Sequence, residues 1–65
     1  MNNQNQDLIK IFNLAITEHQ KENYEEAKKL YKKVLKIDPN HFESNFYLGT
    51  FYAQSNNFNE AFKLL

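Results

Sequence analysis

Several residue types are scarce or missing in this chain, and each absence excludes a class of structure. There is no cysteine, so no disulfide can stabilise the fold. One glycine and one proline are too few for an all-β chain with many turns. No apolar run approaches the roughly 20 residues of a membrane span, and residues 1–6 are too polar for a secretory signal. We expect a small soluble helical unit, in the cytoplasm.

An excess of charge of one sign is also missing. Eight lysines balance eight acidic residues, so net charge drives the chain toward neither nucleic acid nor anionic lipid. A basic segment does occur, with lysines at 28, 29, 32, 33 and 36. The chain has no arginine, the usual reader of phosphate and bases. We therefore interpret the segment as a solvated helix face aided by a Glu25–Lys29 pair, and expect no nucleic acid or membrane partner.

Residues with the chemistry for catalysis or metal binding are sparse. The only histidines, His19 and His41, have no second histidine, cysteine or carboxylate set at metal-ligand spacing. No glycine-rich phosphate loop, nucleophile–base pair or isolated acid pair is present. We expect no catalytic residue, no metal, no cofactor and no enzyme activity.

What the chain does contain is a repeat. Asn23, Asn40 and Asn57 lie 17 residues apart. Each is followed three residues later by a glutamate: Glu26, Glu43 and Glu60. Asparagine is a strong helix N-cap, and glutamate at the third helical position favours the same helix end. Three helix starts at equal intervals predict a 34-residue unit of two helices.

A shift of 34 residues supports this unit. Residues 8–31 align with 42–65, and eight of the 24 pairs are identical. The spacing predicts four helices, over residues 7–21, 24–37, 41–55 and 58–65, preceded by a disordered polar tail over 1–6. Pro39 should end the second helix. The links are short, so neighbouring helices should pack antiparallel.

The apolar pattern assigns faces to the first two helices. In the second helix, the apolar stripe comprises Tyr24, Ala27, Tyr31, Val34 and Leu35, with Leu30 at its margin. The first helix has two apolar rows. One row, Leu8, Ile11, Leu14 and Ala15, can face the second helix. The other, Ile9, Phe12 and Ile16, must meet a further helix, another chain or a ligand. The small residues Ala15, Ala27 and Gly49 should let helix backbones approach closely.

The sequence resembles the tetratricopeptide repeat family, whose pattern is W-x₂-L-G-x₂-Y, then A-x₃-F, then P. The second unit reads Asn45-x₂-Leu48-Gly49-x₂-Tyr52, then Ala61-x₃-Leu65. The first reads Ile11-x₂-Leu14-Ala15-x₂-Glu18, then Ala27-x₃-Tyr31, then Pro39. The resemblance implies an all-α, right-handed solenoid of about four helices, with one repeat over 8–41 and a second, truncated in its second helix, over 42–65.

Two residues depart from the family pattern. Glu18 stands where an aromatic residue is usual, which indicates that the outer edge of the first hairpin packs on nothing, as in an end repeat. Asn45 stands where a large apolar residue is usual, and the sequence offers no physical reason for it.

The resemblance also implies a concave groove lined by the first helix of each unit. The residues carried over to it are Ile9, Phe12, Asn13, Ile16, His19, Gln20, Phe46, Tyr47, Thr50 and Gln54. Some family members clamp acidic tails with cationic side chains here, whereas this chain has Phe12, Ile16 and Tyr47. The groove should suit an apolar helix or extended peptide of a protein partner. Phe12, Phe46 and Tyr47 are either binding anchors or, as we favour, packing between repeats.

Two alternatives to a peptide-binding scaffold stay open. Uncovered apolar residues in the last helix, Phe58, Ala61, Leu64 and Leu65, could drive self-association into a homo-oligomer, because at least three repeats usually bury a continuous core. The chain could also be the N-terminal part of a larger enzyme, such as a glycosyltransferase-like protein, in which these repeats recruit the substrate.

Overall fold

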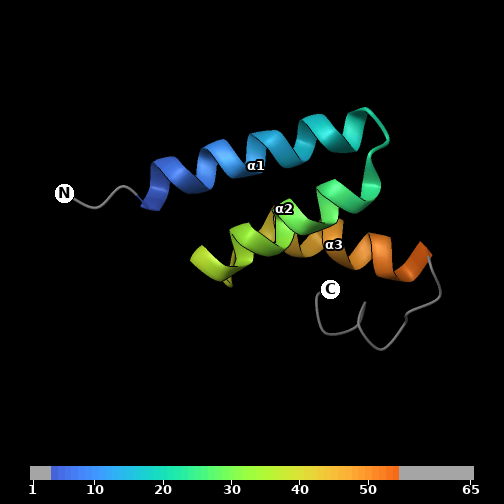
Figure 1. Cartoon of the computed structure of the whole chain (residues 1–65). Coiled ribbons are helices and arrows are strands. Elements are labelled where there is room, and N and C mark those ends of the chain that lie inside the picture. The colour runs from blue at the N-terminus through green and yellow to red at the C-terminus, as the bar shows by residue number, and fades with distance from the viewer. Residues whose placement is uncertain (1–3, 55–65) are drawn as a thin grey trace.

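The structure is a computed structural model that describes residues 4–54. Three helices make up this part of the chain. They are α1 (Gln4–Gln20), α2 (Tyr24–Ile37) and α3 (Phe42–Gln54) (Figure 1). The predicted all-α class is confirmed. The bounds of the second predicted helix match those of α2. The third predicted helix starts one residue before α3, and its predicted last residue, 55, lies outside the described part.

The start of α1 was predicted three residues too late. Residues 4–6 are helical, so the prediction of a disordered tail over 1–6 is wrong for these three. Gln4 and Gln6 belong to a residue type with good helix propensity, and Asp7 in the first turn interacts favourably with the helix dipole. Residues 1–3 and 55–65 lie outside the described part, and with them the predicted fourth helix and self-association face.

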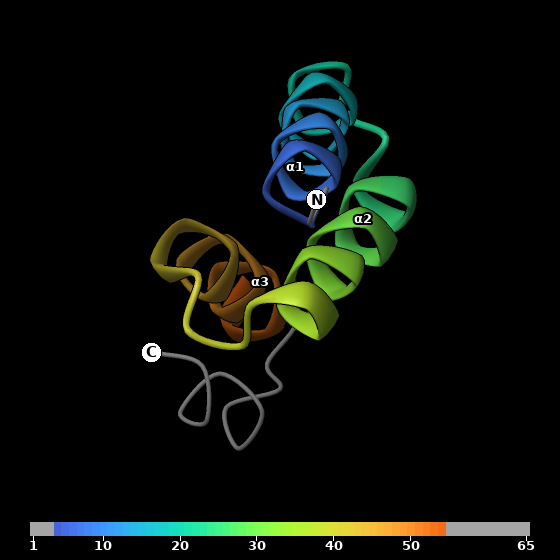
Figure 2. The same ribbon diagram turned by 90° about the vertical axis from the view of Figure 1, so that its left-hand side faces the viewer.

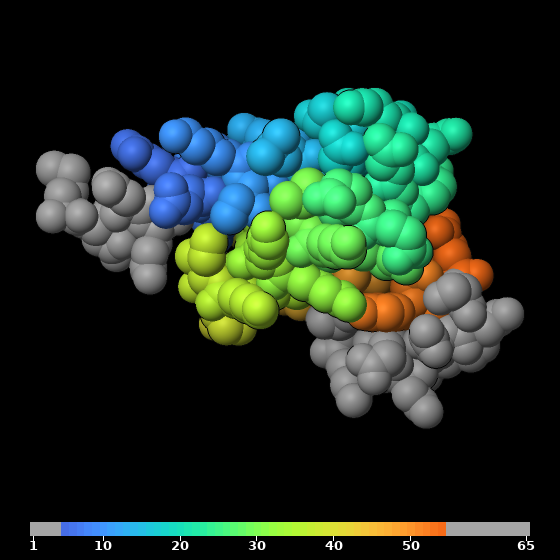
Figure 3. Space-filling view, viewed as in Figure 1, coloured from blue at the N-terminus to red at the C-terminus, as the bar shows by residue number. Residues whose placement is uncertain are grey.

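Viewed nearly end-on, the three helices occupy the corners of a triangle (Figure 2). In the space-filling view, α2 occupies the middle of the face between α1 and α3 (Figure 3). The buried apolar side chains come from all three helices: Ala15, Ala27, Leu30, Tyr31, Val34, Leu48 and Phe51. Ala15 and Ala27 are fully buried, and Gly49 is buried, as expected for small residues at close helix approaches.

Two leucines differ in burial from what the apolar pattern predicts. Leu30, predicted at the margin of the stripe, is buried, whereas Leu14, predicted to face α2, is 54% exposed. The neighbours α2 and α3 cover an arc of α1 that includes Ala15 and Ile16. Leu14 lies outside this arc, because each residue turns a helix by about 100°. Tyr24, predicted in the α2 stripe, is likewise exposed.

The α1–α2 turn closes with the hydrogen bonds of a Schellman motif. The N–H of Glu22 donates to the carbonyl of His19 (3.0 Å), and the N–H of Asn23 donates to that of Glu18 (2.9 Å). Glu22 has φ of 65°, the left-handed region where glycine is usual.

Glu18, the departure from the family pattern, holds the same turn with its side chain. Its carboxylate accepts hydrogen bonds from the Asn23 amide (2.8 Å) and from Lys21 (3.3 Å). These two bonds, that from Asn23 first, hold the pKa of Glu18 below its ordinary value. Asn23 therefore does not cap α2 with its side chain, contrary to the prediction.

The α2–α3 turn explains the second departure, Asn45. Its side-chain amide donates to the carbonyl of Pro39 (3.0 Å) and so ties α3 to the preceding turn. The side-chain cap of α3 is His41 and not the predicted Asn40, because Nδ1 of His41 accepts from the N–H of Ser44 (3.2 Å). The fully buried Ser44 hydroxyl also bonds this nitrogen, at 2.9 Å.

Candidate functional site

A small hollow lies between α1 and α3. Ile16, His19 and Gln20 from the second half of α1 line it, together with Tyr47 from the middle of α3. Its volume is about 200 Å³. Side chains of the two helices meet here, since His19 also contacts Phe51, with ring centroids 4.8 Å apart. Four residues that the sequence assigned to a groove therefore meet at one place.

The other six predicted groove residues differ in how exposed their side chains are to solvent. Ile9 is 55% exposed and Phe46 is 49% exposed, so both present apolar surface to solvent. Asn13 and Gln54 are exposed polar residues. Thr50 is half-buried and uses its hydroxyl within α3, donating to the carbonyl of Phe46 (2.8 Å). The sixth, Phe12, is half-buried against the core.

The predicted aromatic trio divides into packing residues and an exposed one. Phe12 of α1 packs against the start of α3, with its ring 4.8 Å from that of His41. Tyr47 stacks on the buried Tyr31 at 5.5 Å. The interpretation as packing is therefore right for Phe12 and Tyr47. Phe46 is half exposed, with ring contacts to Phe42 and Tyr47 of its own helix.

Sequence reasoning missed an aromatic neighbour of Phe46. Phe42 is 74% exposed and stacks against Phe46, with 6.3 Å between ring centroids. The available signal was their i, i+4 spacing, which places two side chains on one face of a helix. Together they form an exposed apolar ridge on the first turns of α3.

His19 and Tyr47, which line the hollow, belong to a cluster of rings that also contains the buried Tyr31. Nδ1 of His19 lies 2.9 Å from the hydroxyl of Tyr31. Burial, with a smaller contribution from nearby Tyr47, raises the pKa of Tyr31 to about 12. The neutral phenol is therefore the form that the fold stabilises, and its bond to His19 fixes the ring that lines the hollow.

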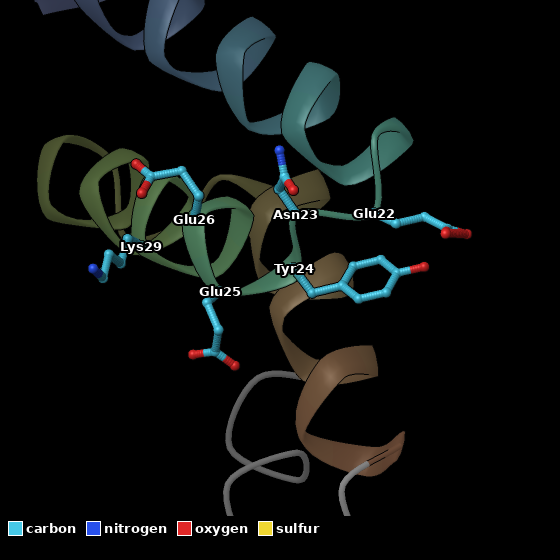
Figure 4. Close-up of a pocket in the computed structure, with 6 residues that line it drawn as sticks. All are labelled: Glu22, Asn23, Tyr24, Glu25, Glu26 and Lys29. Carbon is cyan, nitrogen blue, oxygen red and sulfur yellow. The ribbon is translucent and has the colours of Figure 1, made fainter.

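A second hollow, at the start of α2, has a different character (Figure 4). Its lining is mostly acidic and polar: Glu22, Asn23, Tyr24, Glu25, Glu26 and Lys29. In the close-up these side chains fan out from the turn instead of pointing toward one centre. Glu25 is also engaged outside it, in an ion pair with Lys28 at 2.9 Å that lowers the pKa of the glutamate. The predicted partner for Glu25 was Lys29. This hollow offers no converging set of ligands.

Residues 4–54 contain neither a membrane-spanning helix nor a cluster of metal-binding side chains. No helix in this range is long and apolar enough to cross a membrane. In the same range, no three histidine, aspartate or glutamate side chains gather where they could hold a metal ion.

The architecture defines a class of protein. An antiparallel hairpin of α1 and α2 is followed at the repeat interval by α3. Small residues are buried where these helices pack, and a hollow lies between the equivalent helices α1 and α3, which is the organisation of a helical repeat protein. A family model described as tetratricopeptide repeat matches residues 18–65, more than half of the chain. The chain belongs to the tetratricopeptide repeat family. No curated protein and no solved structure matches it. Repeats of this family generally act as scaffolds for protein–protein interaction.

Proposed function

We propose that this chain is a non-catalytic protein-binding module that receives an apolar peptide or helix of a partner along the α1–α3 groove. The observation that carries the proposal is the hollow between these helices, with Ile9 exposed along α1 and Phe46 along α3. A partner side chain can enter the hollow while neighbouring apolar residues cover these two side chains.

The lining supports an apolar ligand over an acidic one. Ile16 and Tyr47 give the hollow an aliphatic and an aromatic wall, and none of the described residues that line it is a lysine. Gln20 contributes an amide that can bond a peptide backbone. An acidic tail would bring buried charge to this surface without a cationic partner, which is unfavourable.

The proposal can be tested by selecting peptides from a displayed random library against the full chain and measuring their affinity by fluorescence anisotropy. Ile9→Ser combined with Phe46→Ser should weaken the best peptide roughly tenfold or more, because truncating interface anchors costs about 1–2 kcal/mol or more. The matched control is Leu14→Ser, which removes an equally exposed apolar side chain outside the groove.

Two results would count against the proposal. The first is a selection that yields no peptide binding above background. The second is a loss of affinity in the Leu14→Ser control as large as in the double variant. Helicity measured by circular dichroism must stay unchanged in both variants, so that loss of fold is not read as loss of binding.

A second candidate is self-association, which the exposed Leu14 favours. The predicted face at Phe58, Ala61, Leu64 and Leu65 lies outside the described residues and stays a prediction. Sedimentation across a hundredfold concentration range should show a dimer or larger species. Leu14→Lys, or Leu64→Lys with Leu65→Lys, should shift it to monomer. A monomer at every concentration before any substitution would end this candidate.

A further inference from the structure

Charge is segregated in this chain although its total is zero. Five of the eight lysines and only two of the eight acidic residues lie in α2. That helix therefore carries three positive charges in excess, and the rest of the chain three negative ones. The segregation is physical as well as sequential, because four of the lysines, at positions 29, 32, 33 and 36, are exposed.

The spacing of these lysines places them on one face. At about 100° per residue, Lys28 to Lys36 fall within an arc of about 140°, opposite the buried Ala27, Leu30 and Val34. We call this surface the lysine face; its helix lies uncovered in the middle of the view in Figure 3. Among the described residues, only Lys28 of the five takes part in an ion pair, with Glu25.

The lysine face works against the stability of its own helix. Lys29 and Lys33, and likewise Lys32 and Lys36, are like-charge pairs at i, i+4, an arrangement that destabilises a helix. Glu25 offsets part of this repulsion in the first turn, but from Lys29 to Lys36 the exposed residues are all lysine. The like-charge repulsion would be relieved by a surface of opposite sign.

We propose that the lysine face docks an acidic helical segment of a partner protein. Lys29 to Lys36 spans about 10 Å along the axis. A partner helix with carboxylates at i, i+3 or i+4, and i+7 repeats the same spacing in the opposite charge. This surface is separate from the α1–α3 groove, so the inference does not depend on the proposed function.

The chemistry of the lysine face favours protein over nucleic acid or membrane. The chain has no arginine for bidentate phosphate contacts, and its remaining residues would repel an extended polyanion. Between Glu25 and Lys36 the exposed residues are all glutamate or lysine, so no apolar side chain is available to insert into a bilayer.

The test uses a synthetic helical peptide with glutamates at i, i+3, i+4 and i+7, titrated with the full chain and followed by anisotropy. Lys29→Glu with Lys33→Glu should weaken binding roughly tenfold or more, since each reversal turns attraction into repulsion. The control, Lys10→Glu with Lys21→Glu, changes net charge equally outside the lysine face and should weaken binding much less. Circular dichroism should show that both variants keep their helicity.

Three outcomes would overturn the inference. One is absence of peptide binding even at low salt. Another is an equal loss of affinity in the two double variants, which would mean that net charge alone drives association. The third is tighter binding of a DNA duplex, or of phosphatidylserine vesicles, through the same lysines, which would replace an acidic protein by another class of partner.

Discussion

At the scale of single residues, His41 at the start of α3 has a defined structural task. Its Nδ1 accepts the Ser44 N–H, and the buried Ser44 hydroxyl bonds the same nitrogen. We expect His41→Ala to destabilise the chain by about 1 kcal/mol or more, the usual cost of losing a side-chain cap, with further loss from the unpaired hydroxyl. Urea unfolding followed by circular dichroism measures this.

The neighbouring asparagine provides the control for this prediction. Only the backbone N–H of Asn40 is bonded in the turn, to Oδ1 of Asp38, so Asn40→Ala should change stability little. His41→Asp should restore most of the loss, because aspartate is a good N-cap. If Asn40→Ala were the more damaging change, the asparagine cap predicted from the sequence would be right and the histidine cap wrong.

Because of Tyr31, the free energy of unfolding should depend on pH in the alkaline range. The pKa of Tyr31 in the folded chain is raised from 10.0 to about 12, so the stability due to its neutral form is complete below pH 10. That contribution is lost as pH rises from 10 to 12, since the unfolded state releases the proton first. Unfolding free energies at pH 9 to 12 should therefore fall more steeply for the parent chain than for Tyr31→Phe.

The matched variant for this measurement is Tyr24→Phe, which alters an exposed tyrosine. It should follow the parent chain across the whole pH range, because it leaves the buried Tyr31 in place. At neutral pH, Tyr31→Phe should also cost about 1 kcal/mol through the lost bond to His19. Parallel pH curves for Tyr31→Phe and the parent would contradict the burial of this phenol.

Glu22 occupies a position where glycine is the better residue. It stands at the C′ position of the Schellman turn with φ of 65°, which is costly for a residue with a Cβ. Glu22→Gly should raise the unfolding free energy by up to about 1 kcal/mol, with part of the gain offset by the flexibility of glycine in the unfolded chain. Glu22→Ala, which keeps the Cβ, should not stabilise the chain in a thermal melt.

At the scale of helices, the packing of α1 decides which leucines matter. Leu30→Ala should cost about 2–5 kcal/mol, whereas Leu14→Ala should cost much less, because Leu14 leaves no cavity behind. Chemical denaturation of the two variants compares the same substitution at two sites. Equal losses would mean that Leu14 is buried, as the sequence pattern predicted.

The bounds of α2, the exposure of Leu14 and the contact of Asn45 show which features can be predicted from the sequence and which cannot. The bounds of α2 follow from its period and Pro39, because both are local. The exposure of Leu14 depends on how α2 and α3 share the surface of α1, which periodicity alone does not state. Side-chain bonds such as Asn45 to Pro39 depend on the path of a turn, so the sequence alone does not explain Asn45.

At the scale of the whole molecule, the candidate site arises where two equivalent helices meet. The repeat interval brought Ile16 and Tyr47 to one hollow, although 31 positions separate them in the sequence. Which predicted groove residues remain available, such as Ile9 and Phe46, follows from packing that only the fold determines. The groove and the lysine face lie on different parts of the surface. Mapping of chemical-shift changes can therefore distinguish a partner bound in the groove from one bound to the lysine face.

The measurement that tests the central claim most directly is the mapping of a library-selected apolar peptide onto the full chain by backbone amide chemical shifts. The account predicts that the largest changes fall on α1 around Ile16 to Gln20 and on α3 around Phe46 to Thr50. Changes concentrated on the lysine face of α2 or around Leu14, with the groove undisturbed, would contradict it.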